Sequence, residues 1–204
     1  MAYIGLVKPT VAKLDESGGT PKYTDGFTCG EAMEMSINPQ YAEGSLYAND
    51  KLSEYDKEFK YADVTLKTNT LPIQAHNNMF GHTVEGEGDN VKVIKDRTTD
   101  DPNYVGFGIY VKEKVKGVVS FIAMWMYKVK FAEGQEDYKT KGDNIEYQAP
   151  SMAGKATGIT DNVWRERRIF KSADEAQDWL DEMAGIEKTT DVNGEGTREA
   201  ASGI

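Results

Sequence analysis

The chain has little of what catalytic and metal sites are usually built from. It has 204 residues with one cysteine and two histidines. A single cysteine, Cys29, excludes an internal disulfide and cannot by itself hold zinc, so we interpret it as a buried thiol. His76 and His82 lie on either side of Gly81, which is expected to end a helix. No acid or thiol close in sequence completes a ligand set with them, so the sequence predicts no metal site.

Long apolar runs and excess positive charge are also missing. No stretch of about 18 apolar residues is present, so we expect no transmembrane helix and no membrane partner. The first residues, MAYIGLVKPTVAK, do not resemble a signal peptide, which favours a protein that stays in the cytoplasm. The formal net charge of −10 disfavours tight binding to phosphate backbones or anionic membranes. It still allows a protein that lies near nucleic acid without adhering to it.

Signatures of catalysis are absent as well. No serine lies in a G-x-S-x-G turn, and the glycine-containing segment VEGEGDN is acidic, so it would repel a phosphate. Glu54, Asp56 and Glu58 could form a glycosidase-like pair, because neighbours on one strand face are about 6.5–7 Å apart. A solvated strand face explains these acids more simply. We therefore expect no catalytic residues, no cofactor and no enzymatic activity.

The main pattern that the sequence does contain is the alternation of apolar residues. Residues 117–131, GVVSFIAMWMYKVKF, predict a long strand whose odd-numbered residues from Val119 to Phe131 share one face. Other strands are predicted at 3–11, 31–38, 91–96, 104–111, 145–149 and 163–170. Helices are predicted from Thr70 to about Phe80, and from the capping box at Ser172 to Gly185. This pattern predicts a mainly β fold, a β-sandwich or barrel with two short peripheral α-helices.

The apolar faces of these elements define one predicted domain. It spans residues 1–186, and residues 187–204 contain no aromatic residue, so we expect a flexible C-terminal tail. Trp164 and Phe170 are predicted to share one side of their strand. The candidate core residues are Phe121, Trp125, Tyr127, Trp164, Trp179 and Leu180.

Residues 47–68, YANDKLSEYDKEFKYADVTLKT, predict a second long strand with unlike faces. Leu52 and three acids, Glu54, Asp56 and Glu58, fall on one face, and aromatic residues fall on the other. The apolar positions change from odd to even numbers after Tyr61. Such a change requires a β-bulge or a bend, which we place near residues 60–63.

The order of these elements and several local phrases resemble a known family. It is the major tail (tail tube) protein family of phages and prophages of Gram-positive bacteria with long, non-contractile tails. The resemblance covers about residues 1–186. The phrases that carry it are YIGLVKPTVAKL, NPQYAEGSLYANDKLSEYDKEFKYADVTLKTNTLP, FGHT, YVGFGIYVKEK, FIAMWMYKVKF and TDNVWRERRIFKSADEAQDWLDEMAG.

The resemblance implies a structural protein of the virion tail that is assembled in the cytoplasm of the bacterial host. Subunits of this family form hexameric rings, which stack into a tube that conducts DNA during ejection, and long hairpins close into a barrel around the channel. The implied partners are further copies of the chain, the tape measure, tail terminator and distal tail proteins, and DNA in transit.

The resemblance also gives roles to the acidic and aromatic faces of the long hairpin. Glu54, Asp56 and Glu58 are candidates for an acidic row facing the lumen, where like charge would keep DNA from adhering. The aromatic face is expected to pack against the subunit's own sandwich. The candidate inter-subunit contacts are Tyr47, Asn49, Asp50, Lys51, Tyr55, Phe59 and Tyr61. The alternative is a monomeric β-sandwich module that binds a surface or a carbohydrate.

Overall fold

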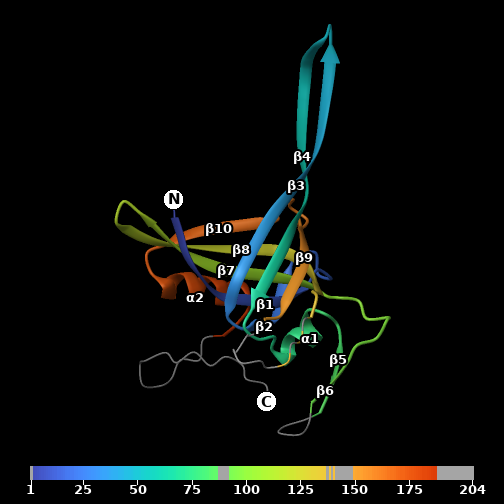
Figure 1. The fold of residues 1–204 in the computed structure, drawn as a ribbon, viewed down its shortest axis with the longest axis vertical. Helices are drawn as coiled ribbons and strands as arrows, with labels where there is room; N and C mark the ends of the chain where they lie inside the picture. Colours follow the sequence, from blue (N-terminus) through green and yellow to red (C-terminus); the bar gives the residue numbers. More distant parts are fainter. Residues whose placement is uncertain (1, 87–91, 137, 139, 141–148, 188–204) are drawn as a thin grey trace.

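The computed structural model describes residues 2–86, 92–136, 138, 140 and 149–187 (Figure 1). Most of the predicted strand at 145–149 and all but the first residue of the predicted tail lie outside these residues. The mainly β fold class with two short helices is confirmed. The elements are β1 Ala2–Asp15, β2 Lys22–Thr28, β3 Ala32–Ala48, β4 Lys51–Thr68, α1 Ile73–Asn78, β5 Thr83–Glu85, β6 Val93–Lys95, β7 Tyr104–Val115, β8 Val118–Glu133, β9 Ser151–Thr157, β10 Arg165–Phe170 and α2 Ala173–Met183.

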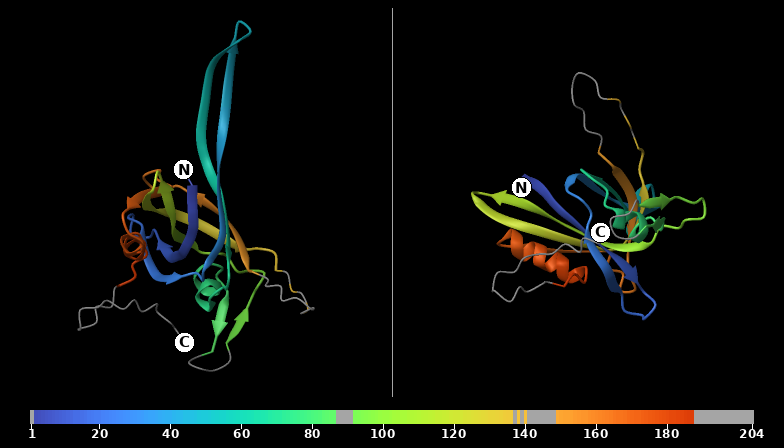
Figure 2. Two further views of the ribbon diagram at one scale, coloured as in Figure 1. Left: turned by 60° about the vertical axis from the view of Figure 1, so that its left-hand side comes forward. Right: turned by 90° about the horizontal axis from the view of Figure 1, so that it is seen from below.

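One antiparallel sheet organises the body of the protein. Its strand order is β2-β1-β7-β8-β9-β4-β3, with β10 paired to β8 beside β9. The sheet curls, so that its two ends enclose the main core together with α1 (Figures 1 and 2). The opposite face of β1, β7 and β8 is covered by α2, which gives a sandwich-like arrangement. The main core includes Val11, Phe27, Cys29, Val64, Leu66, Met79, Phe80, Val105, Phe107, Ile109, Met126, Val129, Phe131 and Met152.

Strand β8 lies at the centre of the sheet. Part of the way along it, the side chains that face the main core change from even-numbered to odd-numbered residues. Its register with β7 shifts between the pairs Phe107–Met126 and Val105–Val129, so β8 has one extra residue there. At the same place its other neighbour changes from β10 to β9. The bulge exchanges the two faces of β8. The prediction of one continuous odd-numbered face is therefore wrong: Trp125 packs under α2, whereas Val129 lies in the main core.

The candidate core residues divide between the two layers. Trp125 is buried against Trp179 and Leu180 of α2, and Phe121 and Tyr127 are partly buried in the same layer. Trp164 packs against the main core instead, and Phe170 packs beside Trp179. The expectation that Trp164 and Phe170 share one side is therefore wrong. Trp164 precedes β10, so the alternation of that strand does not extend to it.

Strands β2, β5 and β9 were not predicted, and β1, β3 and β7 are longer than predicted. Strand β2 follows a turn-rich segment, and β9 has a glycine at its centre that weakens its alternation. A Cβ at Gly154 would lie 2.7 Å from Cδ1 of Phe131, so glycine is needed for that close approach. Strand β1 continues to Asp15, beyond its predicted end at Val11. Inside it, Lys8 has a φ of 44° and the register with β7 shifts between Val7 and Thr10.

The two helices begin and end for local reasons. Helix α1 is shorter than predicted and begins after Pro72. Gly81, with a φ of 76°, reverses the chain after it. Helix α2 has the predicted cap, in which the hydroxyl of Ser172 accepts a hydrogen bond of 3.2 Å from the backbone N–H of Glu175.

Glycines of β7 form the slot that holds Trp125 beneath α2. A Cβ at Gly108 would lie 2.5 Å from the Trp125 ring and 2.7 Å from Leu180. We predict that Gly108→Ala lowers the free energy of unfolding by about 1–3 kcal/mol, because the packed layer must shift. Denaturant unfolding measures this. The matched control is Gly44→Ala, where nothing lies within 4 Å, and equal effects of the two substitutions would contradict the argument.

The half-buried phenol of Tyr23 and the buried thiol of Cys29 predict a loss of stability at alkaline pH. Burial raises the pKa of Tyr23 from 10.0 to about 12 and that of Cys29 from 9.0 to about 12. Above about pH 9 the folded state then binds more protons than the unfolded state, so stability falls as the pH rises. Tm should decline from pH 9 to 11, and Tyr23→Phe should flatten that decline even if it lowers Tm at neutral pH. A Tm independent of pH over this range would contradict the prediction.

Candidate functional site: the β3–β4 arm

Strands β3 and β4 continue beyond the body as a two-stranded ribbon, here called the arm and defined as residues 41–59. Figure 1 shows it projecting from the sheet, and the left view of Figure 2 shows that it stands clear of the body from a second direction. Residues 41–48 pair only with 51–59, because β9 joins β4 only from Ala62 onwards. Every residue of the arm except Phe59 is exposed. Both outer edges of the arm therefore present unpaired backbone groups.

A tight turn closes the arm at its tip. The turn has two residues, Asn49 and Asp50, with φ of 50° and 59°. Positive φ at both positions is typical of a type I′ turn, whose twist matches the twist of the strands. Asparagine and aspartate tolerate this conformation well, so the sequence selects a hairpin here. Lys51, another predicted contact residue, begins β4 immediately after the turn.

A bulge at the base of the arm decides which face of the arm continues the core. The register shifts at Lys60, between the pairs Gln40–Tyr61 and Tyr41–Phe59. This confirms the bulge predicted near residues 60–63. Because the bulge exchanges the faces, Phe59 lies on the same face as the buried Ala62. Tyr61 lies on the opposite face, under the amine of Lys155, so the expectation that Tyr61 shares a face with Phe59 is wrong.

One face of the arm, here called the aromatic face, extends the core-facing side of β3 and β4 beyond the core. No second layer in the described part of the subunit covers it. The aromatic face carries Tyr41, Tyr47, Leu52, Tyr55 and Phe59. Leu52 belongs to it, and not to the acidic face as expected, because a second register shift pairs Leu52 with Tyr47. The side chains of Tyr47 and Tyr55 are 68% and 53% exposed. The prediction that this face packs against the subunit's own sandwich is therefore wrong beyond Phe59.

Phe59 joins the arm to the body. Its ring stacks on Trp164 with centroids 4.8 Å apart, and both side chains pack against the main core. Tyr41 packs edge-on against Phe59 at 6.1 Å. Next along the ribbon, the amine of Lys57 is 2.7 Å from the carboxylate of Glu43 and 4.6 Å from the Tyr41 ring. The hydrogen bond from Lys57 lowers the pKa of Glu43, but exposed pairs of this kind stabilise a ribbon little.

The opposite face of the arm, here called the acidic face, carries Glu54, Asp56 and Glu58. These residues are exposed, and their cross-strand partners are Leu46, Gly44 and Ala42, which are uncharged. Among the residues that the structure describes, none of the three carboxylates forms an ion pair. The acidic face is therefore a strip of uncompensated negative charge flanked by small and apolar side chains.

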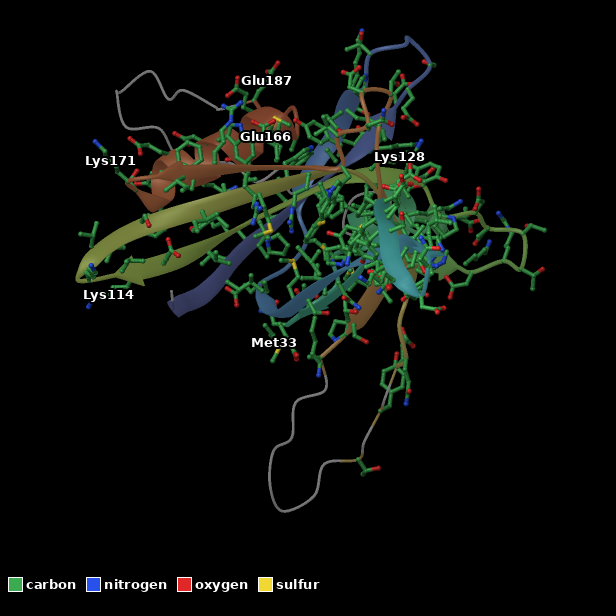
Figure 3. All side chains as sticks on the ribbon, turned by 90° about the horizontal axis from the view of Figure 1, so that it is seen from above. Met33, Lys114, Lys128, Glu166, Lys171 and Glu187 are labelled. Carbon is green, nitrogen blue, oxygen red and sulfur yellow. The ribbon has the colours of Figure 1, made fainter. Side chains whose placement is uncertain are left out.

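A second exposed apolar surface lies at the far end of the β7–β8 ribbon, here called the ribbon patch. It consists of Val115, Val118 and Ile169, with Arg167 beside them on β10. Val118 and Ile169 are 70% and 72% exposed. The pairings of Val115 with Val118 and of Ile169 with Ile122 place these residues on the core side of the sheet. Figure 3 marks this end of the ribbon by Lys114 and shows it extending away from the arm, which is viewed end-on.

Sequence reasoning missed one cluster that the fold assembles. The turn at Gly81 brings His82 back beside His76, and the end of β8 adds Glu133. The sequence offers no acid close to the histidines along the chain, whereas the fold supplies one from a distant strand. A spacing of six residues across a glycine was the available signal, but Glu133 is too distant in sequence to be found.

A search of family models and of curated proteins finds no match to this chain. Within the described ranges, no helix is both long and apolar enough to cross a membrane. The functional argument therefore rests on the geometry of the arm and of the ribbon patch.

Two substitutions in the arm should differ sharply in their effect on the isolated subunit. Phe59→Ala removes the contact with Trp164 and should lower the free energy of unfolding by roughly 1–3 kcal/mol, less than for a fully buried phenylalanine. Tyr55→Ala changes an exposed ring and should stay within about 0.5 kcal/mol of the wild type. Denaturant unfolding at a concentration where the protein is monomeric measures both. A larger loss for Tyr55→Ala would mean that the arm folds back on the body.

Proposed function

We propose that the chain is a structural subunit that assembles with copies of itself through the arm. In the form implied by the resemblance to tail tube proteins, six subunits make a ring and rings stack into a tube that conducts DNA. The other tail proteins of such a particle would be its partners, and the role is not enzymatic.

The observation that carries this proposal is the uncovered aromatic face. A two-stranded ribbon is at best marginally stable in water, because it has no second layer on which to bury a face. The arm nevertheless continues the apolar face of the core, with Tyr41, Tyr47, Leu52 and Tyr55 exposed. Its backbone edges are also free to pair. A second copy supplies hydrogen-bond partners for the edges, since strands of neighbouring arms can pair into one sheet. It also supplies an apolar surface that can cover the aromatic face.

The ribbon patch supports an assembly that repeats from one copy to the next. Val115, Val118 and Ile169 lie on the core side of the sheet but past the edge of the core, so they are exposed like the residues of the aromatic face. Two unlike apolar surfaces on one subunit favour head-to-tail contacts, which close into a ring when the rotation between copies allows. We therefore infer that the aromatic face of one copy packs on the ribbon patch of its neighbour.

The acidic face is then left for the channel. If the aromatic face lies against neighbours, Glu54, Asp56 and Glu58 point to the other side of the barrel wall. A wall of like charge repels DNA and leaves it no resting site, which suits a conduit. Neutral side chains at these positions should leave assembly intact, because the proposal gives the acids no contact between subunits.

Electron microscopy in negative stain, with mass photometry, tests the proposal on the full chain across a concentration series. We expect six-fold rings or hollow tubes at high concentration. Amide hydrogen exchange in residues 41–59 should be fast in the monomer and slow in the assembly. Monomers at every concentration, with arm exchange equally fast throughout, would contradict self-assembly. Binding of a glycan array by such monomers would favour the carbohydrate-binding alternative.

A pair of variants separates the two faces of the arm. Tyr55→Ala should raise the concentration needed for assembly about ten- to a hundredfold, since truncating a buried aromatic anchor costs about 2 kcal/mol or more. The matched variant, Glu54→Gln with Asp56→Asn and Glu58→Gln, should assemble at or below the wild-type concentration. Loss of assembly in the neutralised variant alone would reverse the assignment of the two faces.

A further inference from the structure

We infer that His76, His82 and Glu133 form a binding site for one divalent transition-metal ion of the zinc class. The site lies on the body, away from the arm, and the inference does not depend on the proposed function. Its residues come from α1, from the turn after α1 and from the end of β8.

The distances between the side chains fit a metal centre. Nδ1 of His76 is 3.4 Å from Nδ1 of His82 and 3.3 Å from Oε1 of Glu133. Nδ1 of His82 is 3.8 Å from the same carboxylate oxygen. Tetrahedral ligands at about 2.0–2.1 Å from zinc are about 3.3–3.4 Å from one another. The three donor atoms are therefore already spaced nearly as ligands of one ion.

Their chemistry also fits. Two imidazoles and one carboxylate are a ligand set that zinc uses in proteins, with the fourth position left to water or to another group. Imidazole suits zinc, copper and nickel, whereas magnesium and calcium prefer oxygen ligands. The carboxylate of Asp96, just after β6, is 3.1 Å from Nδ1 of His82, but it is not part of the cluster whose ligand atoms lie within 4.8 Å of one another.

The surrounding structure holds the donors in place. The backbone N–H of His82 donates to the carbonyl of His76 at 2.8 Å, which fixes the turn at Gly81. The buried ring of Phe80 packs near both imidazoles, with centroids 6.0 and 5.7 Å away. The His side chains are only 17% and 10% exposed, and Glu133 is held by the pairing of β8 with β9. Such support orients ligands before an ion arrives.

The ion would have a structural role. It would join α1 and the following turn to the end of β8, segments that are far apart in the sequence. A ligand that binds only the folded state stabilises it, so bound metal should raise Tm. Among the described residues, this cluster is the one that brings three metal-ligating groups together.

Calorimetric titration of the chelator-treated full chain with zinc chloride tests the inference. We expect saturable binding of one zinc ion per chain, a rise in Tm of several degrees on adding zinc, and visible absorption of a tetrahedral site when cobalt(II) replaces zinc. Glu133→Gln keeps the shape of the side chain but removes a ligand, and should weaken zinc binding by about 100-fold or more. His82→Ala should do the same.

Glu85→Gln is the matched control, because it neutralises a carboxylate of the nearby β5–β6 ribbon that pairs with Lys95 instead. It should bind zinc as the wild type does. Absence of saturable binding by the wild type would overturn the inference, and so would equal weakening by Glu133→Gln and Glu85→Gln. If His82→Ala does not fold without metal, Glu133→Gln decides, since its Tm in chelator should match that of the wild type.

Discussion

A β-strand has only two faces, and one inserted residue exchanges them, so the positions of the bulges decide what this protein buries. At Lys60 the exchange continues the core face of β4 into the aromatic face of the arm. In β8 a bulge after Met126 sends Trp125 to the layer under α2 and Val129 to the main core. The same strand thereby serves two packed layers, and its neighbour changes from β10 to β9 at that place.

In the arm, the core-facing side of the strands extends beyond the core, and no layer among the described residues of the subunit covers it. Its aromatic face is the outward extension of a buried surface, yet its residues are exposed beyond Phe59. The stack of Phe59 on Trp164 joins the arm to the body. Within the arm, the described contacts are the β3–β4 pairing, the ring contact of Tyr41 with Phe59 and the exposed pair of Lys57 with Glu43 beside the Tyr41 ring. We propose that another copy of the chain covers this surface. The acidic face combines uncompensated charge with small and apolar cross-strand neighbours, so only the aromatic face suits packing against a neighbour. We therefore assign the aromatic face to neighbours and propose that the acidic face lines a channel.

The body differs from the arm in how fully its groups are packed. Glycines of β7 admit Trp125, and Gly154 admits Phe131, so the layers approach closely. The histidine cluster belongs to this packed part, where Phe80 and the turn at Gly81 fix both rings. A metal ion there would stabilise the body without involving the arm. The proposed assembly and the inferred metal binding thus depend on different residues, so variants at one set should leave the other property unchanged.

The sequence by itself determined the features that depend on neighbouring residues. Alternation identified β3, β4, β7, β8 and β10, the phase change identified the bulge at Lys60, and Ser172 identified the start of α2, because each signal lies within a few residues of its effect. Only the tertiary structure decided which surfaces meet. It placed Tyr61 opposite Phe59, moved Leu52 to the aromatic face and separated Trp164 from Phe170. It also brought Glu133 to His76 and His82, because pairing between strands distant in sequence, and not local pattern, sets those contacts.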